Sequence, residues 1–287
     1  MTGNSEKPKQ DKPVPVVLCA DDYGMNGGIS AGIRVLLAGR RLSATSCMTL
    51  SPHWREEGAT LRRAALQGSV GVHLTLTDGM KPLTVMGRLA PDGKLPPLGQ
   101  LLKRALSRDL DREEIRREFE AQIACFQDVM GRPPDHWDGH HHVHQLPIVR
   151  DVVLELAMAC LPNARPSVRY CDEPLMDLSG RSPALLRASI ISLLGRGFAR
   201  RGRALGLAGN RGFRGVRNFI VEEDVPAMFE KFLTDAKPGL AIMCHPGQPD
   251  PLEGHSDSIA PARIAEYRFL SSEAFPAALA KAGVVVA

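Results

Sequence analysis

The sequence has few of the features that mark a special class of protein. No run approaches the roughly 18 apolar residues that a membrane span requires, and the polar N-terminus MTGNSEKPKQDKP has no apolar centre of the kind found in signal peptides. The six cysteines are scattered and form no C-x-x-C pair, so a disulfide framework is not expected. Aromatic residues make up only 5% of the chain, and no internal repeat is visible. These absences exclude membrane-spanning and disulfide-stapled architectures and predict a cytoplasmic protein.

The chain does have an ordinary globular composition. Its 287 residues are 44% hydrophobic and 24% charged, which excludes collagen-like, coiled-coil and wholly disordered proteins. Residues 1–12 are predicted to be a disordered tail, and residues 13–287 a single domain whose core is large enough to fold without staples.

Apolar runs typical of buried strands alternate with stretches of helical periodicity. The clearest helix covers 112–130, with Asp111 and Glu114 in a capping-box pattern and Gly131 as its stop. Other helices are expected at 29–39, 56–67, 148–160 and 226–236 and near the C-terminus, and a long Gly- and Pro-rich loop at 79–98. Strands are expected at 14–20, 43–50, 70–76, 136–140, 167–171, 218–221, 240–244 and 284–286. This alternation predicts parallel β/α units and an α/β fold.

Polar residues fall in or just after several of these strands. Asp21 and Asp22 end the first strand, His73 lies within the third, His140 ends the fourth, and His245 follows the strand at 240–244. Active sites of β/α barrels are built at the carboxyl ends of the strands. The sequence therefore predicts that these five groups converge in one site.

Each motif also has a simpler interpretation. The ADDYG sequence at 20–24 fits an acidic turn or a helix cap, and His73 fits a buried core histidine. His245 fits a loop histidine that forms hydrogen bonds with the backbone. The cluster WDGHHHVH at 137–144 resembles an exposed loop or a tag, but it lies inside the chain, between a strand and a helix. In an extended segment, its first, third and fourth histidines would line one side (His140, His142 and His144).

Together the motifs indicate a metal site made of one carboxylate and two imidazoles. Such a donor set suits Zn²⁺, Fe²⁺ or, with enough water, Mg²⁺ and Mn²⁺. A second carboxylate as base and another histidine as acid complete an apparatus for metal-assisted hydrolysis of an amide or ester.

Four motifs occur in the order ADDYG, GVHLTLTDGMKPLT, DGHHHVH and CHPG. In this order and spacing they resemble the YdjC-like carbohydrate deacetylases, which include chitooligosaccharide deacetylases and deacetylases of hopanoid biosynthesis. The resemblance extends from about Val16 to the C-terminus and includes Arg263 and Glu266. It implies a distorted (β/α) barrel of the glycoside hydrolase/deacetylase type that removes acetyl from an N-acetylated sugar with a divalent metal ion, Mg²⁺ or Zn²⁺.

The resemblance also implies roles for individual residues. The metal ligands would be Asp22, His73 and His140; Asp21 would be the general base, and His245 the candidate general acid. Candidate substrate contacts complete the expected site (His142, His144, Tyr23 and Phe213). Tyr23 stands where the family more often has Phe, which is expected to add a hydroxyl near the site.

The segment 181–217 concentrates the positive charge of the chain. It contains nine arginines and no acid, and removing these nine from the net charge of +4 leaves −5 for the rest. A partial apolar stripe runs through it (Leu186, Ile190, Leu193, Leu194 and Phe198), interrupted by Arg187 and Arg201. We interpret the segment as a basic insertion that serves as a lid or a homodimer contact, with weak membrane-surface contact as the alternative. The pI of about 8.8 and the few aromatics argue against nucleic-acid binding.

Two other functions stay open at this point. A different metal hydrolase, such as a phosphoesterase or an amidohydrolase-like enzyme, often carries H-x-H on its first strand, whereas here that strand ends in Asp-Asp. A non-catalytic metal- or sugar-binding protein would not need a second carboxylate, Asp21, beside the metal ligand.

Overall fold

The computed structural model describes residues 12–180, 182–220, 222–250 and 257–287. The predicted tail lies outside these residues, except for Lys12. Within the ranges described, no helix combines the length and apolarity needed to cross a membrane.

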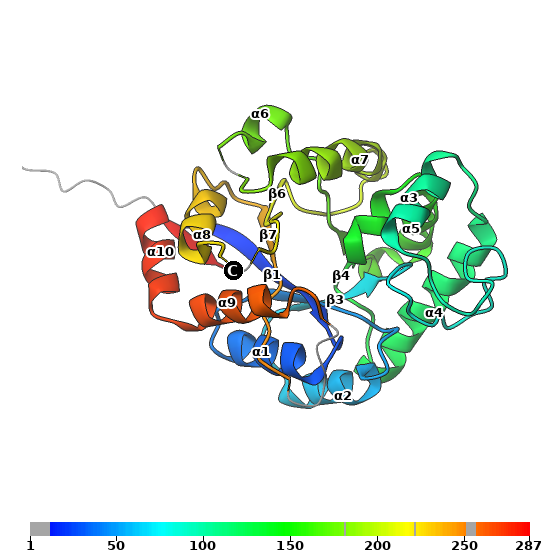
Figure 1. The fold of residues 1–287 in the computed structure, drawn as a ribbon, viewed down its shortest axis with the longest axis horizontal. Coiled ribbons are helices and arrows are strands. Elements are labelled where there is room, and N and C mark those ends of the chain that lie inside the picture. Colours follow the sequence, from blue (N-terminus) through cyan, green and yellow to red (C-terminus); the bar gives the residue numbers. More distant parts are fainter. Residues whose placement is uncertain (1–11, 181, 221, 251–256) are drawn as a thin grey trace, which may run out of the picture.

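A curled parallel sheet forms the centre of the molecule (Figure 1). Its strand order is β5-β4-β3-β2-β1-β7-β6, and β8 pairs with the start of β1. A parallel bridge between Val168 and Gly209 joins β5 to the segment just before β6, so the two ends of the sheet meet. The predicted α/β barrel is thus confirmed. The strands are β1 (Val14–Tyr23), β2 (Ala44–Cys47), β3 (Ser69–Leu74), β4 (His136–Gly139), β5 (Ser167–Val168), β6 (Gly212–Arg214), β7 (Leu240–Cys244) and β8 (Val284–Val286).

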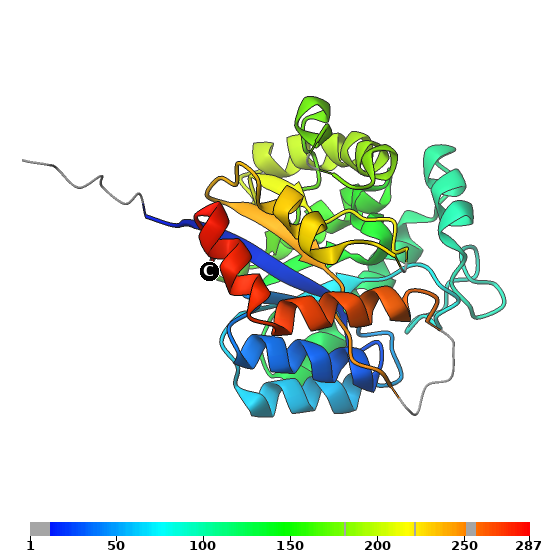
Figure 2. The same cartoon turned by 60° about the vertical axis from the view of Figure 1, so that its left-hand side comes forward.

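Helices surround the sheet. In both views α1, α2 and α9 lie on one side of it, whereas α6 and α7 form a layer on the opposite side (Figures 1 and 2). The α-helices are α1 (Gly27–Ala38), α2 (Trp54–Ala64), α3 (Leu98–Leu106), α4 (Arg112–Met130), α5 (Val149–Ala159), α6 (Leu175–Leu178), α7 (Leu185–Ala204), α8 (Val225–Leu233), α9 (Ala260–Ser271) and α10 (Ala274–Ala282). Two short 3₁₀ turns are η1 (His140–Gln145) and η2 (Pro162–Ala164).

Helix α4 has the bounds that its caps predicted. The side chain of Asp111 accepts hydrogen bonds from the backbone N–H groups of Glu113 and Glu114, and Gly131 ends the helix at φ 71°. Helix α3, in contrast, was not predicted. The strand expected at 218–221 is wrong for residues 218–220, which form no strand, and Val221 lies outside the described residues. The strand occurs earlier, at Gly212–Arg214, where it pairs with β7.

The amino ends of the strands surround a cavity of about 750 Å³. Small side chains from four strands line it, namely Ala44, Ser69, Ser167 and Ala241. Barrel interiors are usually filled by larger branched side chains, so the small ones leave space here. The ADDYG and CHPG motifs lie at the other end of the barrel.

Candidate active site

The end of β1 brings two adjacent carboxylates into the barrel. Neighbouring residues of a regular strand face opposite sides, but one extra residue of β1 lies between the pairs Ala20–Thr45 and Tyr23–Cys47. This bulge includes Asp22, whose φ of 67° is in the left-handed region. As a result Asp21 and Asp22 are both buried, each 1% exposed, and they have different partners. Strained backbone of this kind is concentrated at functional sites.

The three residues expected to hold a metal lie together. One oxygen of Asp22, Oδ1, is 3.1 Å from Nδ1 of His140 and 3.5 Å from Nε2 of His73. All three side chains are buried, and their donor atoms lie within 4.8 Å of one another. The carboxyl ends of β1, β3 and β4 thus supply one carboxylate and two imidazoles to one point.

A second carboxylate orients each imidazole. Nδ1 of His73 donates to Oδ1 of Asp138 over 2.6 Å, and Nε2 of His140 donates to Oδ2 of Asp78 over 2.7 Å. In each ring the other nitrogen therefore faces Asp22. A carboxylate behind a metal-binding imidazole is the usual arrangement in metal sites, where it sets the tautomer and the ring orientation.

This donor set fits a divalent cation. Each imidazole lies between two carboxylates, so positive charge is needed between the ring and Asp22, as a proton or a metal ion. Burial alone would lower the pKa of His140, but Asp22 and Asp78 raise it to about 9. Two imidazole nitrogens and one carboxylate oxygen match the three protein ligands of many catalytic metal sites.

Arg263 fixes the second oxygen of Asp22. Its Nη2 donates to Oδ2 of Asp22 over 2.7 Å, and its Nε donates to Asp257 over 2.8 Å. Burial favours the neutral carboxyl, but Arg263 and His140 hold the pKa of Asp22 well below its usual range. The carboxylate is therefore charged, with Oδ1 left to face the imidazoles.

Arg169 of the β5 end, which the sequence analysis did not single out, holds Asp21. Both terminal nitrogens donate to Asp21, each over 2.6 Å, and Nη2 is also 2.5 Å from Oδ2 of Asp138. Arg169 is 6% exposed. Because Asp138 contacts His73 as well, one buried network joins Asp21 to the cluster of Asp22, His73 and His140. Planar bidentate pairing of this kind fixes a carboxylate in both position and orientation.

His245 lies at the end of β7 beside the same cluster. Its backbone N–H donates to Glu266, and its ring packs edge-on against Phe219 with 5.0 Å between centroids. Nδ1 of this ring is buried and has no hydrogen-bond partner among the described residues. Burial lowers the pKa of His245 to about 4, although Asp22 and Asp21 act in the opposite direction. The ring is therefore neutral near pH 7.

The cluster of four histidines does not form the extended segment that we expected. β4 ends at Gly139, and η1 contains His141 and His142 with φ values of 53° and 57°. Two left-handed residues in succession end the strand geometry, so the predicted alternation of His140, His142 and His144 along one side is wrong.

Two expected substrate contacts are core residues instead. His144 is 0% exposed; its Nε2 donates to the backbone oxygen of Arg169, and its ring packs on Phe198. Tyr23 is also 0% exposed, and its hydroxyl donates to the backbone oxygen of Glu57. The idea that the Tyr23 hydroxyl lies near the site is therefore wrong, because the bulge that turns Asp22 inward leaves Tyr23 pointing to α2.

The other two expected contacts lie near each other. The ring of His142 is 5.5 Å from that of Phe213 and nearly perpendicular to it, and the guanidinium of Arg169 lies 5.9 Å from the Phe213 ring centroid. His142 is half-buried, whereas Phe213 is 3% exposed. Of the residues we expected to touch substrate, His142 has the most accessible side chain.

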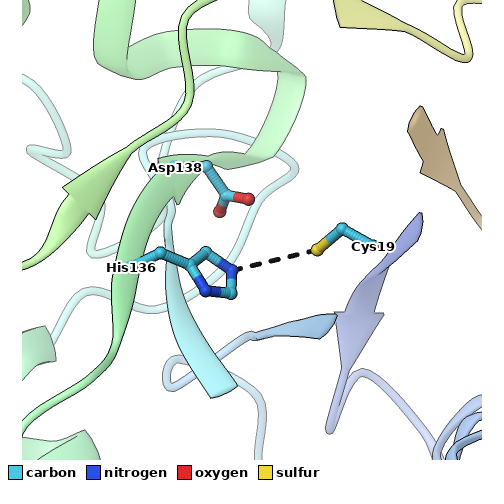
Figure 3. A group of neighbouring side chains, drawn as sticks. All are labelled: Cys19, His136 and Asp138. Carbon is cyan, nitrogen blue, oxygen red and sulfur yellow. Dashed lines mark hydrogen bonds between the residues drawn. The ribbon is translucent and has the colours of Figure 1, made fainter. Parts of the chain in front are cut away.

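A second group of metal-type ligands lies deeper in the barrel, nearer the cavity. Sγ of Cys19 is 3.8 Å from Nε2 of His136, with Asp138 nearby (Figure 3). Oγ of Ser46 lies among them, 3.0 Å from His136 and 2.5 Å from Asp138. Nη2 of Arg169 is a further 3.3 Å from Cys19. Ser46 and Arg169 thus supply hydrogen-bond partners to all three members of this group.

The curled parallel sheet, with buried carboxylates and imidazoles at the carboxyl ends of its strands, defines a barrel protein of the class that carries active sites at this end. The chain belongs to the YdjC-like family, whose model matches residues 15–281.

A solved structure shares the fold. A protein of Enterococcus faecalis V583, provisionally described as a cellobiose-phosphate cleavage protein, is 22% identical with a TM-score of 0.71; the match covers 96% of this chain and 97% of that one. A more distant match is a family 4 carbohydrate esterase from Streptomyces lividans, which is 10% identical with a TM-score of 0.47; the match covers 95% of this chain and 91% of that one. Another is a polysaccharide deacetylase from Bacillus cereus, which is 12% identical with a TM-score of 0.43; that match covers 96% of this chain and 90% of the other.

Proposed function

We propose that this protein is a metal-dependent hydrolase that removes acetyl from an N-acetylated sugar. The observation that carries the proposal is the cluster of Asp22, His73 and His140 with a second carboxylate, Asp21, held next to it. Membership of the YdjC-like family supports a carbohydrate substrate. A cytoplasmic location and a homodimer stay predictions.

Asp22, His73 and His140 would hold the metal ion. When bound there, a divalent ion supplies a Lewis acid for the acetamide carbonyl and for water. Zn²⁺ accepts two imidazoles readily, whereas Mg²⁺ prefers oxygen ligands and would need several waters. Both ions stay in the proposal, because the site offers one carboxylate and two imidazoles.

The chain's own residues perform the proton transfers. Asp21 accepts a proton from the attacking water, and Arg169 keeps both of its oxygens in place for this step. His245 delivers a proton to the leaving amine. Because burial keeps His245 neutral near pH 7, the proton that it delivers is the one that Asp21 takes from the attacking water and passes to His245 before the C–N bond breaks. His142 and Phe213 are proposed to line the path of the sugar.

The test combines an activity screen with metal binding. Acetate release is measured over N-acetylated sugars after EDTA treatment and after Mg²⁺, Zn²⁺, Mn²⁺ or Co²⁺ is added back. We expect Asp22→Ala, His73→Ala and His140→Ala to lose metal by calorimetry. Asp21→Asn should keep the metal but lose turnover. An Asp21→Asn variant with full activity would contradict the role of this residue as base.

The same screen separates the alternative, another metal hydrolase of the phosphoesterase or amidohydrolase-like type. The similar protein of Enterococcus faecalis is described as acting on cellobiose phosphate, so a phosphorylated disaccharide belongs in the screen. Phosphate release without acetate release would replace the deacetylase proposal.

A further inference from the structure

The longest helix of the insertion, α7, has its apolar side chains on the outside. Its buried positions are mostly small, namely Ala188, Ser192, Gly195, Phe198, Ala199 and Gly202. Its large aliphatic side chains are exposed instead: Leu185, Leu186, Ile190 and Leu193 are 48%, 77%, 48% and 50% exposed. Surface helices normally show the reverse distribution. Large exposed apolar surfaces of this kind mark interaction sites.

The stripe expected from the sequence is thus split between two faces. Phe198 is fully buried and Leu194 packs against the core, whereas Leu186, Ile190 and Leu193 share the outer face. These three positions are spaced by four and three residues, which places them in one row along the helix. The adjoining helix α6 adds Met176, at 90% exposed, to the apolar surface of this layer.

Positive charge accompanies the row. Arg196 and Arg200 are exposed on α7 and form no ion pair with any acid among the described residues. Two arginines further along α7 form ion pairs within the protein: Arg201 pairs with Asp151, and Arg203 pairs with Asp172. The outer side of α7 therefore combines an apolar row with unpaired positive charge.

The sequence places Arg187 within the apolar stripe. In the structure, Arg187 does not interrupt this row. Its Nη1 donates to the backbone oxygen of Arg217, and its guanidinium lies 5.9 Å from the Phe219 ring centroid. Phe219 packs in turn on His245. The N-terminal part of α7 thus adjoins the loop beside the candidate active site.

We propose that the outer face of α7, formed by Leu186, Ile190, Leu193, Arg196 and Arg200, docks on an anionic lipid surface. Helices that lie in a membrane interface insert aliphatic side chains between lipids while arginines contact anionic headgroups. A second copy of the chain is the less favoured occupant, because a contact between two such faces would bring their unpaired arginines together without any acid. Docking would hold the candidate active site close to the bilayer surface.

The test is cosedimentation of the full chain with vesicles. One set contains phosphatidylglycerol mixed with phosphatidylcholine, and the other contains phosphatidylcholine alone. We expect binding to the anionic vesicles that weakens as salt is added. Removing two arginines with R196Q/R200Q should weaken it about 30-fold, and the triple variant L186Q/I190Q/L193Q more than about tenfold.

Matched controls remove the same groups elsewhere on the surface. V35Q/L106Q/L161Q replaces three exposed aliphatic residues, and R55Q/R117Q replaces two exposed arginines. Both controls should bind like the wild-type protein, and circular dichroism checks that every variant is folded.

Three outcomes would overturn the proposal. The first is that the wild-type protein does not bind anionic vesicles at low salt. The second is that the control variants lose as much binding as the variants of the α7 face. The third is that the wild-type protein is a dimer which L186Q/I190Q/L193Q converts to a monomer, while vesicle binding is unchanged. The last outcome would assign this face to a second copy. Because vesicle binding needs no turnover, these results stand apart from any failure of the deacetylase proposal.

Discussion

Replacing Arg169 with methionine should weaken the fold and the activity together. The guanidinium is 6% exposed and donates to two buried carboxylates, Asp21 and Asp138. Removing one partner of a buried ion pair costs about 3–5 kcal/mol, because the remaining charges stay buried without compensation. For a domain of this size that corresponds to a fall in Tm of about 6–10 °C.

The effect on activity follows from geometry. Arg169 contacts both oxygens of Asp21, and a misplacement of about 1 Å in a catalytic group can cost about a hundredfold in rate. We therefore expect Arg169→Met to lower kcat at least a hundredfold under conditions where the variant is folded. Arg169→Lys keeps the charge but not the planar pair of donors, so its Tm and kcat should lie between those of the wild-type protein and Arg169→Met.

The assay is thermal unfolding followed by circular dichroism, together with acetate release well below the lower Tm. Arg112→Met is the matched control, because Arg112 pairs with Glu155 on the surface with 41% of its side chain exposed. Exposed pairs contribute about 0–1 kcal/mol, so this control should unfold and react like the wild-type protein. If Arg169→Met also has the Tm and the activity of the wild-type protein, the buried network around Arg169 neither stabilises the fold nor positions Asp21, and the reasoning is refuted.

Three further predictions concern other parts of the barrel. Asp138→Asn removes the carboxylate behind His73, a proposed metal ligand, and metal affinity by calorimetry should fall about 10–100-fold; an unchanged affinity would refute the orienting role. Gly71→Ala should lower Tm strongly, because an added Cβ would lie 2.3 Å from the ring of His136. Gly99→Ala in α3 is the control: its Cβ would meet no atom within 4 Å, so the Tm should not change. Only Cys125 and Cys160 should react with a thiol reagent in the native protein, because they are partly exposed, whereas the other four thiols are buried; more than two reactive thiols without unfolding would contradict this.

Local information was sufficient for several elements. Helix α4 begins after Asp111 and ends at Gly131 because a side-chain cap and a left-handed glycine act within a few residues of each other. The parallel order of strands and helices follows from the alternation of apolar runs. The convergence of Asp22, His73 and His140 follows because parallel strands place their carboxyl ends at one edge.

Short segments without local patterns were not predictable in the same way. β6 has three residues and depends on pairing with β7. η1 needs two successive residues with positive φ, His141 and His142, which the surrounding structure stabilises and the sequence does not indicate. These conformations depend on contacts made after the chain has folded.

The sequence by itself determined the fold class, the family and the residues that we propose as metal ligands, because these depend on periodicity, motif order and residue type. Only the tertiary structure decided how those residues are held and which neighbours serve the site. It paired Arg169 with Asp21, Arg263 with Asp22 and Asp138 with His73. It also buried Tyr23 and His144 in the core. The physical reason is that hydrogen bonds and ion pairs between distant strands depend on register and on the bulge at the end of β1, and neither leaves a local pattern in the sequence.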